Sequence, residues 1–181
     1  MLLAALSIGG ALAPEGALAR TKSASCPGAN LRPNTTNAAA VDAATLCLID
    51  QLRTAHGLRP LRSNRQLQTV AARQVHCLVR WNYFADDCPS WLTPAARIAR
   101  TSYAAHAAGL SIGQNIGWGT GPFTTPAEMV AAWMSSPPHR AIILTGAYAD
   151  AGVGVTPIVP SDLGVGEGGA TYAIEFAVRL L

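Results

Sequence analysis

Apolar residues recur at helical spacing near the start of the chain. Over residues 38–56, Ala44, Leu48 and Leu52 fall on one face at intervals of four, which predicts a helix. Gly57 follows at the position of a C-terminal cap, where a glycine often ends a helix. Residues 20–37, rich in Ser, Thr, Asn and Pro, predict an extended arm in front of this helix.

A second helix is predicted to begin at Ser63-Asn64-Arg65-Gln66, which has the pattern of a capping box. It runs to about Trp81. A short third helix is predicted to begin at Thr93-Pro94 and to reach Ala99, because proline is favoured at the first helical position. The apolar face of the second helix consists of Leu67, Val70, Ala71 and Leu78.

The clearest helix start in the chain is Thr125-Pro126-Ala127-Glu128, with threonine at the N-cap, proline at N1 and glutamate at N3. Pro137-Pro138 is predicted to break this helix. Its apolar residues are expected to be core, because a Met and Trp stripe at helical spacing usually is. They are Met129, Val130, Trp133 and Met134.

Two strands are predicted late in the chain. Residues 151–155 alternate small and branched side chains, and residues 171–178 alternate around Tyr172, Ile174 and Phe176. The Gly- and Pro-rich residues 157–170 between them suit an antiparallel hairpin. Helices first and strands late predict α+β layering rather than repeated βαβ units.

The composition indicates one folded domain. The chain has 181 residues, half of them apolar and 13% charged, which is too hydrophobic for a disordered chain. The net charge of +3 is mild. The densest basic set is loose and is interpreted as solvated arginines, so we expect no nucleic-acid partner. This set is Arg53, Arg59, Arg62 and Arg65.

The N-terminus resembles an export signal. Residues 1–18 are largely apolar but interrupted at Pro14, too short to span a bilayer, and we expect no transmembrane span in the mature chain. Ala17-Leu18-Ala19 suits cleavage before Arg20, which makes residues 1–19 a predicted signal peptide. No Lys or Arg precedes the apolar stretch, so the basic start usual for such signals is missing.

The cysteine count is even, which in an exported chain indicates disulfides. Four cysteines allow three pairings, and the simplest joins residues that are close in sequence, Cys26 with Cys47 and Cys77 with Cys88. The spacings lack the paired cysteines of a zinc ribbon. Four free buried thiols are the alternative.

Several short motifs occur together in a fixed order. They are residues 46–61, Asn82-Tyr83-Phe84-Ala85-Asp86, Gly113-Gln114-Asn115-Ile116, residues 133–144 and residues 153–155. In this order they resemble the CAP superfamily of cysteine-rich secretory proteins, antigen 5 and pathogenesis-related 1 proteins (the SCP domain), in its compact bacterial branch. The resemblance implies an α+β fold, an α-β-α sandwich with a small antiparallel sheet between helices. It assigns residues 38–181 to the CAP domain and implies an extracellular or cell-envelope location.

The resemblance also implies a cleft, in which two His and two Glu of the family can hold a divalent metal. This chain departs from that pattern. Asp86 stands at the first His, Gln114 replaces one Glu, Ser136 occupies the place of the other, and only His139 is kept. An amide has no useful basicity near neutral pH, so the loss of the Glu favours a non-catalytic protein over an enzyme.

We therefore expect a secreted binding module for a lipid, a glycan or an extracellular protein. Its cleft is expected around Asp86, Gln114, Asn115 and His139. One alternative is a metal-dependent hydrolase of peptide or cell-envelope substrates, with His139 and Asp86 holding zinc or magnesium weakly. A structural envelope protein is the other alternative.

Overall fold

The computed structural model describes residues 25–89, 92–163 and 168–180. The predicted signal peptide, residues 1–19, lies outside the described residues. The helices are α1 (Ala38–Ala55), α2 (Arg65–Arg80), α3 (Pro94–Ala99), α4 (Pro126–Ser135) and α5 (Pro137–Ile143), with short 3-10 turns at Ser102–Ala104 and Gly121–Thr124. The strands are β1 (Arg62–Ser63), β2 (Gly109–Thr120), β3 (Asp150–Thr156) and β4 (Gly169–Leu180).

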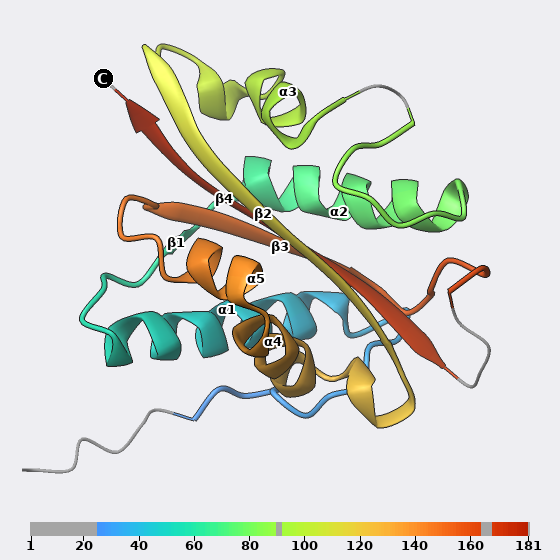
Figure 1. Cartoon of the computed structure of the whole chain (residues 1–181). Helices are drawn as coiled ribbons and strands as arrows, with labels where there is room; N and C mark the ends of the chain where they lie inside the picture. The colour runs from blue at the N-terminus through green and yellow to red at the C-terminus, as the bar shows by residue number, and fades with distance from the viewer. Residues whose placement is uncertain (1–24, 90–91, 164–167, 181) are drawn as a thin grey trace, which may run out of the picture.

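The strands form one sheet in the order β1-β3-β4-β2. The predicted hairpin is confirmed, because β3 and β4 pair antiparallel with Val153 opposite Ile174. β2 pairs antiparallel with β4, and the two-residue β1 pairs parallel with β3, so the sheet is mixed. Figure 1 shows α1, α4 and α5 on one side of this sheet and α2 and α3 on the other. The predicted α+β fold, an α-β-α sandwich, is thus confirmed.

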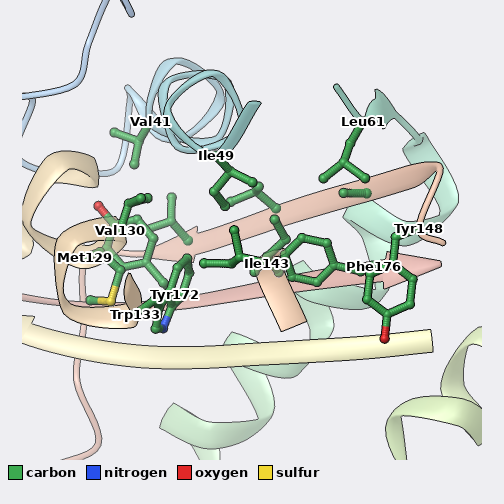
Figure 2. Close-up of a cluster of buried hydrophobic side chains, with 14 of the residues drawn as sticks. Val41, Ile49, Leu61, Met129, Val130, Trp133, Ile143, Tyr148, Tyr172 and Phe176 are labelled. Carbon is green, nitrogen blue, oxygen red and sulfur yellow. The ribbon is translucent and has the colours of Figure 1, made fainter. Parts of the chain in front are cut away.

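The main core fills the space between the sheet and the α1, α4 and α5 layer. Even-numbered residues of β4 such as Tyr172 and Phe176 point into it, and Figure 2 shows them facing Ile49 of α1 and Trp133 of α4. The predicted stripe on α4 is largely confirmed as core, since Met129, Val130 and Trp133 are buried and Met134 packs against them.

On the opposite face of the sheet, α2 lies very close to β3 where the two elements cross. A Cβ atom on Gly152 or Gly154 would collide with the backbone of α2, at Gln68 and Ala72 respectively. The helix therefore lies backbone against backbone on the strand. The predicted apolar face of α2 covers this side of the sheet, and all four of its residues are buried.

The start of α2 differs from the sequence prediction by one residue. Asn64, not Ser63, is the N-cap, and its side-chain oxygen accepts hydrogen bonds from the backbone N–H groups of Gln66 (3.0 Å) and Leu67 (3.2 Å). Ser63 is displaced from the cap because it pairs with Ala151 in β1. The Thr93 and Thr125 caps are confirmed.

Both predicted disulfides are present, Cys26–Cys47 and Cys77–Cys88. The first ties the N-terminal arm to α1. The second ties the loop after α2 back to the end of that helix. No helix among the described residues is long and apolar enough to cross a membrane.

The prediction that Arg53 is a solvated arginine is wrong. Its side chain is fully buried, and its guanidinium donates to the backbone carbonyls of Arg59, Ile143, Thr145 and Tyr148 at 2.7–3.2 Å. Ile143 is the last residue of α5, Thr145 and Tyr148 lie between α5 and β3, and Arg59 lies between α1 and β1. Arg53 thus holds the connection between α5 and β3, whereas Arg62, with a side chain 72% exposed, pairs with Asp150 at the surface.

Candidate functional site

Two of the predicted cleft residues are neighbours in β2 and face opposite sides of the sheet. Gln114 points toward α2 and α3, where its amide Nε2 donates to Glu175 Oε1 at 2.7 Å. Asn115 points toward α4 and α5, where its Nδ2 donates to the backbone carbonyl of His139 at 3.1 Å. Successive side chains of a strand alternate in this way, so β2 itself separates Gln114 from the His139 segment.

Asp86 is exposed in the loop that the second disulfide pins. Its backbone carbonyl accepts hydrogen bonds from Gln74 Nε2 and Arg97 Nη1, both at 3.1 Å. Within the part of the chain that the structure describes, its carboxylate makes no hydrogen bond or ion pair. Asp86 therefore contributes its main chain to the surrounding contacts.

His139 lies in the first turn of α5 and is half-buried. Its Nδ1 is 2.7 Å from the Ser136 hydroxyl, which orients the ring and leaves Nε2 directed away from that contact. The orientation is set locally, because Ser136 is the N-cap residue of α5 and Pro137 begins the helix. Among the four predicted cleft residues, His139 is the one that lines a pocket at this edge of the sheet.

These residues do not fit a divalent metal. Among the described residues, no group of three or more His, Cys, Asp or Glu side chains lies close enough to share an ion. Zinc takes four ligands and magnesium six, whereas His139 offers one imidazole nitrogen and the Gln114 amide is engaged with Glu175. No metal-dependent step is assigned to this site.

A buried carboxylate that the sequence analysis did not single out lies beside Gln114. Glu175 of β4 is fully buried, and Arg97 Nη2 lies 3.4 Å from its Oε1. Burial raises the pKa of Glu175 to about 7, although the charge of Arg97 and the hydrogen bonds from Gln114 and Arg97 act in the opposite direction. We call Gln74, Arg97, Gln114 and Glu175 the buried polar cluster.

A sequence signal for this cluster does exist. Glu175 stands between Ala173 and Ala177 on the strand face opposite Tyr172 and Phe176, so a strand buried on both faces carries one acid among small residues. Among the described residues, each of the four side chains has one buried polar atom without a hydrogen-bond partner. These atoms are Gln74 Oε1, Arg97 Nε, Gln114 Oε1 and Glu175 Oε2.

The pocket beside His139 lies along β2, an edge strand of the sheet, and we call it the rim pocket. It has a volume of about 240 Å³. Its floor is tight, because a Cβ atom on Gly117 would collide with the Met129 sulfur and come within 3.0 Å of the Trp133 indole nitrogen. The residues that line it are Phe84, Ile116, Gly117, Trp118, Met129, Ala132, Trp133, Ser136 and His139.

The rim pocket offers apolar and aromatic surface with one imidazole. The indole of Trp133 is buried and donates to the Ile116 carbonyl at 3.0 Å, which fixes the ring. Trp118, in contrast, is 38% exposed on the edge strand. A pocket lined by an exposed aromatic ring and an oriented imidazole suits a ligand that is mostly apolar and carries one polar atom.

Comparisons with known proteins agree with this architecture. The model of the cysteine-rich secretory protein family (CAP) matches residues 46–158. No curated protein sequence matches the chain. Among the solved structures that share the fold at low sequence identity are three bacterial proteins.

The first is an extracellular protein containing an SCP domain from Bacillus anthracis, with a TM-score of 0.63 and 22% identity over 81% of this chain and 44% of that one. The second is an outer surface protein from Borrelia burgdorferi, with a TM-score of 0.58 and 18% identity over 74% of this chain and 89% of that one. The third is a cysteine-rich secretory protein from Staphylococcus aureus, with a TM-score of 0.56 and 17% identity over 80% and 40%. The chain thus spans less than half the length of the first and third.

Proposed function

Because this chain belongs to the cysteine-rich secretory protein (CAP) family, we propose that it is an exported, non-catalytic binding module. Its rim pocket takes a small, largely apolar ligand. The observation that carries this proposal is the lining of that pocket, in which the apolar side chains of Phe84, Trp118 and Met129 accompany the imidazole of His139. Apolar walls with few polar groups are typical of small-molecule sites.

The buried polar cluster supplies no carboxylate that could act with His139 on a ligand in the rim pocket. General acid–base catalysis requires a titrating group within hydrogen-bond reach of the substrate. The Glu175 carboxyl is fully buried behind Gln114, on the sheet face that His139 does not occupy. Its proton is therefore not available to a ligand in the rim pocket.

Binding is tested with N-phenyl-1-naphthylamine, a neutral apolar probe whose fluorescence rises in apolar surroundings. We expect saturable binding to the wild type and at least a tenfold loss in Ala132→Phe, which places a ring in the rim pocket from an exposed position of α4. Ala131→Phe is the matched control. Ala131 is the preceding, equally exposed residue but lines a different groove, between α1 and α4.

The two variants separate the proposal from its alternatives. Loss of binding in Ala131→Phe with full binding in Ala132→Phe would place the ligand in the α1–α4 groove and overturn the assignment to the rim pocket. Absence of saturable binding to the wild type would also overturn the apolar-ligand proposal and favour a glycan or protein partner.

Export is tested separately. The full chain is produced in a bacterium, fractionated and sequenced from its N-terminus. We expect the protein outside the cytoplasm with Arg20 as its first residue, because residues 17–19 have the small-x-small pattern of a cleavage site. Retention of an uncleaved chain in the cytoplasm would contradict the proposal.

A further inference from the structure

A second cavity, of about 230 Å³, lies on the α2 and α3 side of the sheet. Arg73 and Gln74 of α2 and Arg97 and Arg100 of the α3 segment line it, and we call it the arginine cavity. It shares no lining residue with the rim pocket. The proposed function leaves this cavity unused.

The lining is strongly positive. It contains three guanidinium groups and no carboxylate. Arg97 has one ion pair, with Glu175 at 3.4 Å, while Arg73 and Arg100 are exposed and make no ion pair within the described residues. Because burial raises the pKa of Glu175 to about 7, that carboxyl balances the charge of Arg97 only in part at neutral pH.

Arg97 is held rigidly at the inner wall of the cavity. Its Nη1 donates to the carbonyls of Asp86 (3.1 Å) and Leu92 (2.6 Å), on the loop that the Cys77–Cys88 disulfide pins. Within residues 25–89, 92–163 and 168–180, the buried Nε of Arg97 has no hydrogen-bond partner. The hydrogen bonds of Nη1 fix the guanidinium, so its positive charge stays at the cavity wall.

The remaining wall of the arginine cavity is apolar. Val70, Leu92 and the Cys77–Cys88 disulfide form it. Gln74, whose Nε2 is fixed by the carbonyls of Ala85 and Asp86, is the other polar side chain at the wall. An occupant must therefore satisfy guanidinium groups and also contact apolar surface.

We propose that the arginine cavity binds a small organic carboxylate with an apolar body. A carboxylate matches the planar donor fork of a guanidinium, which can bind both of its oxygens at once. The volume is below the usual range of about 300–1,000 Å³ for small-molecule pockets. The apolar body is therefore limited to a single ring or a short chain.

The test is isothermal titration calorimetry at pH 7 with benzoate and hexanoate as probes. Benzamide serves as a neutral analogue of benzoate and inorganic phosphate as an anion without an apolar body. We expect saturable binding of at least one carboxylate, and affinities at least tenfold lower for benzamide and phosphate. Added salt is expected to weaken carboxylate binding, because Arg73 and Arg100 are exposed.

Variants locate the site. Arg73→Gln combined with Arg100→Gln is expected to weaken carboxylate binding at least tenfold, since it removes two of the three guanidinium groups. Arg65→Gln removes an exposed charge from the same helix outside the cavity and is expected to leave affinity unchanged. Near-UV circular dichroism verifies that each variant is folded.

Three results would overturn the proposal. Neither carboxylate binds the wild type; benzamide or phosphate binds as tightly as the carboxylate; or the double variant binds as the wild type does. Ala132→Phe is expected to retain carboxylate binding, so failure of the rim-pocket proposal and failure of this one are distinguishable.

Discussion

Replacing Glu175 with glutamine tests whether burial or ion pairing dominates the buried polar cluster. Glutamine resembles a protonated glutamate in shape and keeps an oxygen that can accept from Gln114. In the wild type, burial raises the pKa of Glu175 from 4.5 to about 7, so the folded protein holds a proton that the unfolded chain has released. The proton stabilises the fold, and this stability is present below pH 4.5 and lost as the pH rises toward 7.

The size of the effect follows from the two pKa values. A rise from 4.5 to about 7 corresponds to about 3 kcal/mol of stability lost across this window. Glu175→Gln cannot titrate. At pH 5 we expect the free energy of unfolding of this variant to lie within about 1 kcal/mol of the wild-type value, because the glutamine and the buried Glu175 of the folded protein are both neutral. At pH 8 we expect it to be more stable than the wild type by about 3 kcal/mol, even though it removes an ion pair with Arg97.

The assay is urea unfolding with the disulfides intact, followed by tryptophan fluorescence at pH 5 and pH 8. Asp162→Asn, which removes an exposed carboxylate, is the control and is expected to follow the wild type. Asp42 is half-buried, and partial burial also raises its pKa to about 7, so the stability of Glu175→Gln is expected to retain part of its pH dependence. Combining Glu175→Gln with Asp42→Asn is expected to remove more of it. Greater destabilisation by Glu175→Gln at pH 8 than at pH 5 would show that pairing with Arg97 outweighs burial.

Three further variants probe the scaffold, each by urea unfolding. Arg53→Met is expected to lower the free energy of unfolding by about 3 kcal/mol or more, because it leaves buried carbonyl groups without a donor. Arg59 is exposed, so Arg59→Met is expected to change stability little, and equal effects of the two variants would contradict the described role of Arg53. Gly152→Ala is expected to lower the free energy of unfolding by about 3 kcal/mol or more, because the added Cβ atom collides with the α2 backbone. Gly146→Ala, whose Cβ meets only Leu58 at 3.5 Å, is expected to be tolerated, and a stable Gly152→Ala would refute the close packing. Cys88→Ser removes the disulfide to Cys77, which closes a loop with a sequence separation of 11, and is expected to lower the free energy of unfolding by about 3 kcal/mol. An unchanged urea midpoint would contradict this expectation.

Four of the five helices that the structure describes, α1 to α4, could be predicted from the sequence because their signals are local. Helix α5 was missed, because Pro137-Pro138 was interpreted as the end of the preceding helix and not as the start of a new one. Caps such as Thr93 and Thr125 act within a single turn, and the structure places both where they were expected. The N-cap of α2 was misplaced by one residue because the pairing of Ser63 with Ala151, far along the chain, takes Ser63 into β1. A two-residue strand has no periodicity from which it could be predicted.

Strand β2 was missed for a different reason. Its odd positions at Gly113, Gly117 and Gly119 are glycines because side chains or backbone of the covering layer approach too closely for a Cβ atom. The alternation that marks a strand is therefore erased on that face. Without β2, the opposite directions of Gln114 and Asn115 could not be foreseen, nor could the contact between Gln114 and Glu175.

The position of β4 in the sheet has a consequence for how the chain is made. β4 lies between β3 and β2, yet it is the last strand in chain order. During synthesis β2 cannot pair until β4, which begins at Gly169, has been made, so the sheet cannot close before then. Such non-local pairing slows folding, because loop closure costs entropy before contacts repay it. A nascent chain of this topology therefore keeps its sheet open until β4 has been synthesised.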